Sequence, residues 1–351
     1  MSKKIGIHVL TAYPPSNPNR DENGQPKTAV VNGVTRQRIS SQCIKRAWRL
    51  SEIMKSIEGS MSLRTRGLGL EVEAAMVAAG ADPKVAKKRS AAIAGAFGKV
   101  NDKKAPEHKE MIIIGHEERE GALALGKLLA TENRDPTAAE LETLQRDTTS
   151  IDVAMFGRMR AAATKFNVDA SIYVAHPLTT GKATIDADFW TSVDDLKLAD
   201  DEADGGAGGM GDVEFGSGTY YTYVEVNRDG LIHNLKDDKS VESDSKAIGL
   251  ANSAILKLIE AIANVSPGGH KTTFGNQVRA SYLRVEVGQP SGNLFCKAYE
   301  EPISGTAKAI EKLRDVATAE ATAYGLAQTV FEFSPPQTLA SVLEGTQRAL
   351  G

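Results

Sequence analysis

The sequence predicts an α+β fold in which a block of helices is inserted between strands. Three observations predict it. A β-branched run opens the chain at Ile5–Leu10, an Ala-rich stretch from about residue 60 to 147 has helical periodicity, and strand-like runs return after it. Strands and helices mixed in this order are typical of α+β proteins.

Local signals place each element in turn. Tyr13-Pro14-Pro15 ends the first strand, and a loop rich in proline and asparagine leads to Arg38-Ile39-Ser40-Ser41-Gln42 and a helix of roughly sixteen residues. Prolines at 83, 106 and 136 interrupt the helical block. Later strands are predicted at 151–155, 171–175, 219–226 and 282–287, and closing helices at 303–324 and 337–350. Two Gly-rich stretches are expected to be loops, the acidic residues 197–212 and the basic residues 266–276.

Length and composition exclude several classes of protein. The 351 residues could hold two or three units of about 150 residues each. No apolar stretch approaches the roughly 20 residues that span a bilayer, and the N-terminus lacks the apolar core of a secretory signal. Two cysteines, Cys43 and Cys296, exclude a disulfide scaffold and a multi-cysteine metal site. We therefore expect a cytoplasmic protein without a membrane contact.

Positive charge is concentrated at the start of the chain. Residues 1–66 contain twelve Lys or Arg and four Asp or Glu, a net charge of +8, whereas the whole chain has −3. A basic first sixth on an otherwise acidic chain indicates a localised site for a polyanion. The alternative is an ordinary solvated surface.

The predicted helix after Ser40 and Ser41 carries the strongest functional signal. Gln42, Lys45, Arg46 and Arg49 stand at i, i+3, i+4 and i+7, so they share one face. Ile44, Ala47, Trp48 and Met54 supply an apolar stripe that can pack on a sheet. Serines are good N-caps, and free backbone N–H groups at a helix start suit a phosphate backbone. Four basic residues just upstream could extend the track: Arg20, Lys27, Arg36 and Arg38. The alternative is an amphipathic helix with a solvated face.

Two weaker signals accompany this helix. Phe189 and Trp190, followed by Thr191, lie between strand-like segments, where they could pack in a core or stack on bases. Gly268-Gly269-His270-Lys271-Thr272 would let backbone approach a phosphate closely.

The sequence contains no convincing catalytic, cofactor-binding or metal-binding motif. Gly206–Gly211 fits G-x-G-x-x-G, but it follows no strand and is surrounded by acids. Gly121–Leu128 resembles a P-loop, but it lies in a helical pattern and ends in Leu128 instead of a hydroxyl residue. The six histidines never recur at i, i+4, and His176, in a strand before Pro177, is expected to be hydrogen-bonded and structural. We expect no catalytic residue, no metal and no cofactor.

Several motifs occur in the order known from one protein family and extend over nearly the whole chain. They are Ile7-His8-Val9-Leu10, Asn19-Arg20-Asp21, Arg38-Ile39-Ser40-Ser41-Gln42 with Lys45-Arg46-Ala47, Gly157-Arg158-Met159, Ala175-His176 with Thr179-Thr180, Val193-Asp194-Asp195-Leu196, Glu214-Phe215 and Tyr324-Gly325-Leu326. The chain resembles the Cascade backbone subunit of type I-E CRISPR interference complexes, the CasC family. It departs from the family pattern in its acidic 197–212 stretch and in a shortened segment after Met159.

The resemblance implies a hand-shaped protein. A ferredoxin-like, RRM-like palm would comprise 1–58, 171–182 and 215–351 with the C-terminal helices, helical fingers 59–170, and a β-hairpin thumb 183–214. Such subunits form a head-to-tail homo-oligomer along the spacer of a CRISPR RNA (crRNA), kink it with the thumb and present guide bases to target DNA. Other Cascade subunits and a recruited helicase-nuclease would be further partners in this antiviral defence.

The resemblance also implies which residues contact RNA. Those matched to RNA phosphates and sugars are Arg20, Lys27, Arg38, Ser40, Ser41, Gln42, Lys45, Arg46, Arg49, Arg158, Lys271 and Thr272, and those matched to the thumb wedge are Phe189, Trp190 and Thr191. One alternative is a metal-dependent target-RNA endonuclease like the backbone subunits of type III complexes. Another is a single-strand binding protein unrelated to CRISPR.

Overall fold

The chain divides into two compact units, each built from separate stretches of sequence. The computed structural model describes residues 3–57, 61–144, 150–160, 166–192, 209–236 and 244–351. The first unit comprises residues 1–56, 174–226 and 255–351, and the second comprises 57–173 and 227–254. The predicted α+β class is confirmed, with antiparallel pairing between strands.

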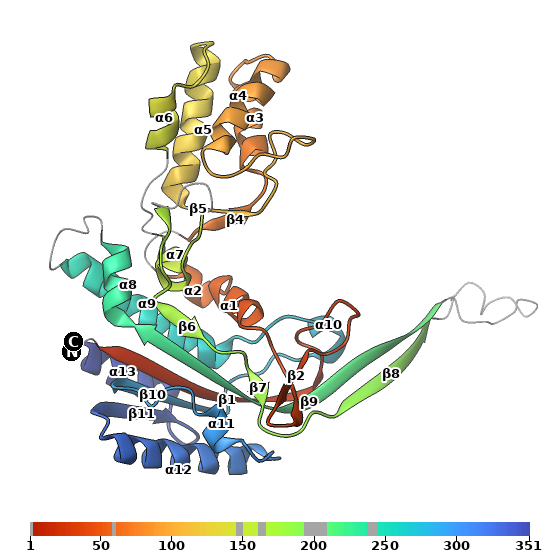
Figure 1. Ribbon diagram of the computed structural model, residues 1–351, viewed down its shortest axis with the longest axis vertical. Helices are drawn as coiled ribbons and strands as arrows, with labels where there is room; N and C mark the ends of the chain where they lie inside the picture. The colour runs from red at the N-terminus through yellow and green to blue at the C-terminus, as the bar shows by residue number, and fades with distance from the viewer. Residues whose placement is uncertain (1–2, 58–60, 145–149, 161–165, 193–208, 237–243) are drawn as a thin grey trace, which may run out of the picture. The chain divides into compact units, whose positions relative to one another are not determined.

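An antiparallel sheet forms the centre of the first unit (Figure 1). Its strands run in the order β11-β10-β1-β9, and β7 and β8 pair with β9. Their bounds are β1 (Lys4–Ser16), β7 (Leu178–Thr179), β8 (Ile185–Ser192), β9 (Gly209–Asn227), β10 (Tyr282–Gly288) and β11 (Gln328–Phe333). A separate hairpin of β2 (Thr28–Val31) and β3 (Val34–Gln37) turns at Asn32-Gly33, where both φ angles are positive as a type I′ turn requires.

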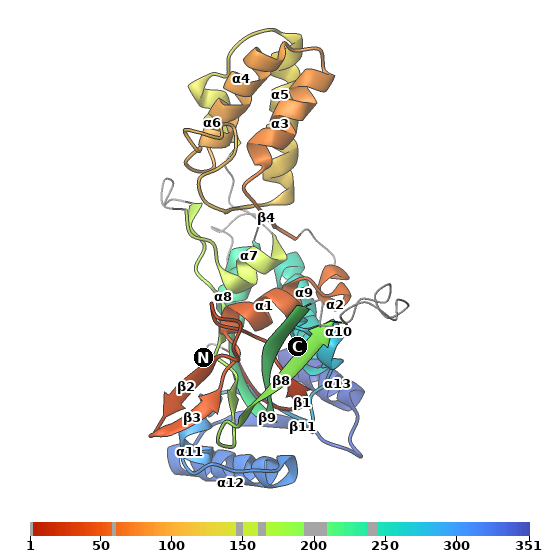
Figure 2. The same cartoon turned by 90° about the vertical axis from the view of Figure 1, so that its right-hand side faces the viewer.

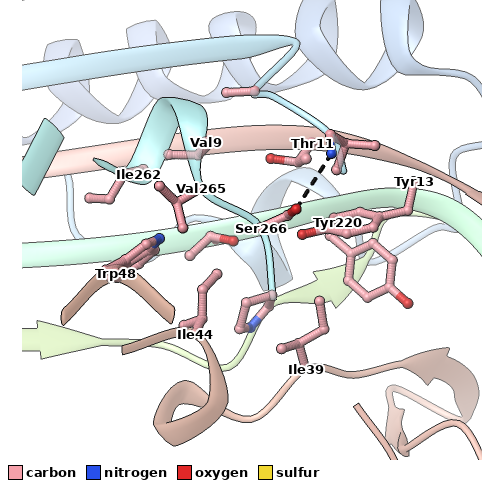
Figure 3. Close-up of a pocket in the computed structure, with 14 residues that line it drawn as sticks. Val9, Thr11, Tyr13, Ile39, Ile44, Trp48, Tyr220, Ile262, Val265 and Ser266 are labelled. Carbon is pink, nitrogen blue, oxygen red and sulfur yellow. Dashed lines mark hydrogen bonds between the residues drawn. The ribbon is translucent and has the colours of Figure 1, made fainter. Parts of the chain in front are cut away.

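Helices bury both faces of this sheet. The helices that lie wholly in the first unit are α1 (Ser41–Arg49), α2 (Glu52–Lys55), α10 (Lys271–Phe274), α11 (Phe295–Ala298), α12 (Thr306–Tyr324) and α13 (Leu339–Leu350). On one face, α11 and α12 pack against Leu10, Tyr221 and Tyr282. On the other, Ile44 and Trp48 of α1 point at Val9 of β1 across a void of about 10 Å³ (Figure 3). Ile44 and Trp48 of the predicted apolar stripe therefore anchor this helix to the sheet, whereas Ala47 lines a different cavity and Met54 belongs to α2.

Arg36 of β3 is a structural residue and not part of an RNA-binding track. Its guanidinium is completely buried and donates hydrogen bonds to the backbone carbonyls of Thr179, Thr180 and Tyr299, the last at 2.8 Å. Burial lowers the pKa of Arg36. The carbonyl oxygens replace the water that a buried cation loses.

The second unit is mainly helical (Figure 2). Its elements are β4 (Leu63–Thr65), α3 (Leu68–Ala78), α4 (Pro83–Gly95), β5 (Ile112–Ile114), α5 (His116–Thr131), α6 (Ala138–Thr143), α7 (Ile151–Phe156), β6 (Ile172–Val174), where the chain passes into the first unit, and α8 (Arg228–Leu235). Its core joins Leu68 and Val72 of α3, Ile93 of α4, and Leu125 and Leu129 of α5.

Helix α9 (Ser245–Asn264) is long and apolar enough by composition to cross a membrane. Half of its most apolar window is buried inside the protein, as in the core helix of many folded domains. Leu258, Ile259 and Ile262 are among its buried side chains. This helix qualifies the expectation that no apolar stretch approaches a membrane-spanning length.

Three sequence predictions were wrong in detail. The strand expected at 151–155 is helix α7. The sixteen-residue helix stops at Arg49 because Ser51 caps a new helix, its Oγ accepting a hydrogen bond from the Met54 N–H at 3.2 Å. Residues 209–212 belong to β9, whereas 197–208 lie outside the described residues.

The P-loop-like residues Gly121–Leu128 lie in α5, so substitutions of Gly121 and Gly126 can be compared within one helix. A Cβ at Gly126 would lie 2.9 Å from Val72 Cγ1, whereas one at Gly121 would make an ordinary 3.6 Å contact with Leu144. Gly121→Ala should raise the free energy of unfolding by about 0.5–1 kcal/mol, because alanine favours helix. Gly126→Ala should lower it by about 1–3 kcal/mol through overpacking. Urea denaturation measures both, and equal effects would contradict the packing.

Candidate nucleic-acid interface

The start of α1 is tied to two distant segments. Ser40 is the N-cap, and its Oγ accepts a hydrogen bond from the Cys43 N–H at 3.2 Å. The Ser40 N–H donates to Asn19 Oδ1 at 2.8 Å, and the Ser41 N–H donates to His176 Nδ1 at 3.0 Å. The expectation of a hydrogen-bonded His176 is confirmed, although the residue lies outside any strand. The backbone N–H groups of Ser40, Ser41 and Cys43 are therefore already used within the protein.

His176 keeps its acceptor nitrogen because protonation is disfavoured there. Burial lowers the pKa of His176 first, and the positive charges of Arg38, Lys45 and Lys27 lower it further. Lys45 of α1 and the upstream Arg38 and Lys27 therefore all lie near His176.

The polar face of α1 is narrower than the sequence spacing predicted. Gln42 and Arg46 are exposed and Lys45 is half-buried, but Ser41 and Arg49 are buried. Arg49 closes the last turn of the helix, where packing encloses its side chain. Ser41 and Arg49 are thus corrected to interior positions, and Gln42, Lys45 and Arg46 remain at the surface.

Residues 17–27 form a rigid loop, here called the asparagine loop, that precedes β2. Asn17 is completely buried, and its Nδ2 donates to the carbonyls of Gly24 and Glu214 at 3.0 and 2.9 Å. The Lys27 N–H donates to Asn19 O, and the Arg38 N–H donates to Lys27 O. These hydrogen bonds bring the segments that carry Arg20, Lys27 and Arg38 close together.

The Gly-rich loop (residues 266–276) lies directly against the asparagine loop. A Cβ at Gly269 would lie 2.3 Å from Pro18 O, so only glycine allows this backbone contact. The buried Asn276 donates to Gly269 O at 2.9 Å and holds the loop in place. Arg20 Nη1 lies 2.7 Å from His270 Nε2. Residues about 250 apart in the sequence therefore meet at one site.

Together these segments line an open groove of about 630 Å³, here called the basic groove. It is lined by Pro18, Asn19, Arg20, Asp21, Glu22, Gly24, Cys43, Arg46, Ala47, Pro267, Gly268 and Gly269. Arg20 and Arg46 supply positive charge from two different segments, and Asp21 and Glu22 of the asparagine loop supply negative charge in the same lining. Burial raises the pKa of the Cys43 thiol, so it stays neutral. Lys271 and Thr272 are exposed in the same Gly-rich loop.

The β8–β9 hairpin carries the predicted aromatic pair in β8. Phe189 is 61% exposed and Trp190 is 45% exposed, so neither is a core residue of the chain. Phe189 pairs with Asp212 and Trp190 with Gly211. Successive side chains of a strand point to opposite faces, so Phe189 and Thr191 share one face and Trp190 lies on the other. Residues 193–208, which connect the two strands, lie outside the described residues.

Comparison with known proteins assigns the chain to a protein family. The model of the CT1975-like protein family matches residues 5–347. The chain belongs to the CT1975-like protein family. A search of curated proteins finds no match.

Solved structures share the fold of this CT1975-like protein. A chain of a CRISPR RNA-guided surveillance complex described as pre-nicking matches with a TM-score of 0.82 and 23% identity, over 99% of this chain and 100% of that one. A chain of another CRISPR RNA-guided surveillance complex matches with a TM-score of 0.72 and 20% identity, over 99% of each chain. The relationship predicted from the sequence is confirmed at the level of family and fold.

One predicted RNA contact of this CT1975-like protein lies in the interior of its second unit. Arg158 is buried, and its Nη1 lies 3.0 Å from Glu118 Oε2. Arg160 Nη2 lies 2.8 Å from the same oxygen, so one carboxylate joins two guanidinium groups. Arg158 is corrected from a phosphate contact to a structural residue.

Sequence reasoning also missed residues that build the site of this CT1975-like protein. Asn17 and Asn276 carried no motif: Asn17 donates to Glu214 O, 197 residues away, and Asn276 donates to Gly269 O within its own loop. His270 lay in the predicted Gly-rich motif, but its contact with Arg20, 250 residues away, was not predicted. Within the part of the chain that the structure describes, no three His, Cys, Asp or Glu residues cluster so as to hold a metal ion.

The Gly-rich loop offers a matched pair of variants. Gly269→Ala should force the loop away from Pro18 and widen the groove, because the new Cβ would overlap a backbone oxygen. We expect RNA affinity to fall about tenfold or more, equivalent to about 1.4 kcal/mol. Gly268→Ala meets nothing within 4 Å and should bind like the wild type. Filter binding to single-stranded RNA compares them, and equal affinities would contradict the assigned contact.

Proposed function

We propose that this protein is a backbone subunit of a CRISPR RNA-guided surveillance complex, and specifically of a type I-E Cascade. The observation that carries the proposal is the basic groove, formed where α1, the asparagine loop and the Gly-rich loop meet in a chain with the fold of such subunits. Arginine side chains such as Arg20 and Arg46 of this groove can donate to a phosphate backbone without reading its sequence. The groove would thus hold crRNA while base pairing selects the target.

In this proposal residues 1–58, 171–182 and 215–351 are the RRM-like palm, residues 59–170 are the fingers, and the hairpin within residues 183–214 is the thumb. Copies would assemble head to tail along the crRNA spacer, each thumb kinking the RNA with Phe189, Trp190 and Thr191. The exposure of the aromatic pair supports this role, because such side chains on a free hairpin can stack on bases. Since Phe189 and Trp190 lie on opposite faces, one would contact displaced bases and the other the neighbouring subunit.

The proposed partners are crRNA, target DNA paired with it, further copies of this chain, other Cascade subunits and a recruited helicase-nuclease. The protein would act in the cytoplasm as a scaffold without catalytic activity.

Sequencing the RNA that co-purifies with the native assembly tests this function. We expect a single class of repeat-spacer RNA and an oligomer whose size follows spacer length. A mixture of unrelated cellular RNAs, or a chain that stays monomeric with crRNA and partner subunits, would refute the proposal. Magnesium-dependent cleavage of complementary RNA by the assembled complex would instead support the endonuclease alternative.

Arg46 tests phosphate contact in the groove. It is exposed and lines the cavity, so Arg46→Ala should weaken RNA binding similarly for unrelated sequences. The slope of log affinity against log salt should become shallower by roughly 0.7 per bound subunit. Lys55→Ala is the control, because Lys55 is a cation outside the groove that pairs with Glu52 at 2.9 Å. An unchanged slope for Arg46→Ala would exclude the contact.

The thumb assignment predicts a different effect. Phe189→Ala with Trp190→Ala should leave the salt slope of guide binding nearly intact, because neither residue is charged. It should impair target-DNA binding by the assembled complex, whereas Ile185→Ala, an exposed residue of the same strand, should not. Thermal unfolding of the RNA-free subunit should shift by no more than a few degrees. Normal target binding by the double variant would reject the wedge.

A further inference from the structure

His270 has an uncommon backbone conformation beside the basic groove. Its φ is +49°, in the left-handed region that side chains other than glycine rarely adopt. Glycines occupy positions 268, 269 and 275 of the same loop. Non-glycine residues held in this region concentrate at functional sites. The loop therefore presents an imidazole at a position where glycine would have been less strained.

The ring of His270 is held by defined contacts. Arg20 Nη1 lies 2.7 Å from His270 Nε2, and a guanidinium can only donate, so Nε2 accepts and carries no proton. The other side of the ring lies near Phe274, with 5.9 Å between ring centroids. Phe274 in turn lies 5.5 Å from Phe215 of β9. In the free chain His270 is thus neutral and oriented toward a cation of the groove.

We propose that His270 is a further RNA contact that takes up a proton when a phosphodiester enters the basic groove. The inference rests on the proposed function, since the phosphodiester is that of the guide RNA. A phosphate between the two side chains would accept hydrogen bonds from Arg20, releasing Nε2. The proton would come from solvent onto Nε2, and the imidazolium would donate it to a phosphate oxygen in a charge-assisted hydrogen bond.

The charges around His270 give the direction of the effect. Burial lowers the pKa of His270 in the free chain, and the positive charge of Arg20 lowers it further. Charged groups of the surrounding segments are Arg46 of α1, Asp21 and Glu22 of the asparagine loop, and Lys271 beside it. A bound phosphate adds negative charge and raises the pKa of His270. Binding therefore takes up protons, and affinity rises as pH falls between the bound-state and free-state pKa.

The pH profile of RNA affinity tests this linkage at constant ionic strength. Wild-type affinity for a mixed-sequence single-stranded RNA should rise from about pH 8 to about pH 6, about tenfold for each unit by which binding raises the pKa. His270→Asn should flatten the profile, because asparagine tolerates the left-handed region and keeps an acceptor for Arg20 but does not titrate there. His233→Asn, an exposed histidine of α8, should keep the wild-type profile.

Two results would overturn the inference. One is a His270→Asn profile that coincides with the wild type, and the other is a profile flattened only by His176→Asn. A measurement on the wild type avoids any folding defect: the NMR titration of the His270 imidazole should move to higher pH with RNA, and an unmoved titration also overturns it. RNA binding that does not vary with pH would remove only this inference, whereas no RNA binding at any pH would remove the proposed function as well.

Discussion

The backbone contact between Gly269 and Pro18 is the constraint on which the basic groove depends. It joins two loops that carry opposite walls of the cavity, and no side chain fits between them. Hydrogen bonds order each loop separately: Asn17 donates to Glu214 O, the Ser40 N–H donates to Asn19 Oδ1, and Asn276 donates to Gly269 O. Losing the bond of the buried Asn17 or Asn276 Nδ2 would leave that amide nitrogen unsatisfied, which favours the observed loop conformations. In the proposed function, the loop backbone that carries Arg20 is ordered before RNA binds, which reduces the entropy lost on binding.

The arginines of this chain divide into two groups by burial. Arg36 and Arg158 are enclosed: the Arg36 Nη atoms donate to carbonyl oxygens, and Arg158 pairs with a carboxylate. Arg20 and Arg46 line an open cavity. A buried cation without such partners would cost several kcal/mol, so the enclosed arginines are committed to the fold. The exposed ones remain available to a polyanion, which supports the proposed role in holding RNA.

In the proposed function the hairpin and the groove contribute different kinds of interaction. The groove supplies charge and donors, which act on any nucleic-acid backbone. The hairpin supplies exposed aromatic surface, which acts on bases or on a neighbouring subunit. Alternation along β8 places Phe189 and Trp190 on opposite faces, so a single hairpin can engage two surfaces at once.

The sequence by itself determined the α+β class, the cap and apolar stripe of α1, and the basic character of the first segment, because these follow from local patterns. It also pointed to Arg20, Gln42, Lys45 and Arg46, since spacing on a helix and a short loop can be read directly. Tertiary structure alone decided that Ser41, Arg49 and Arg158 are buried and that residues 151–155 are helical. It alone joined Arg20 to His270. Burial and long-range contacts depend on how segments distant in the sequence pack together. Arginines that look alike in their local sequence can therefore be buried or exposed, and no local pattern predicts which.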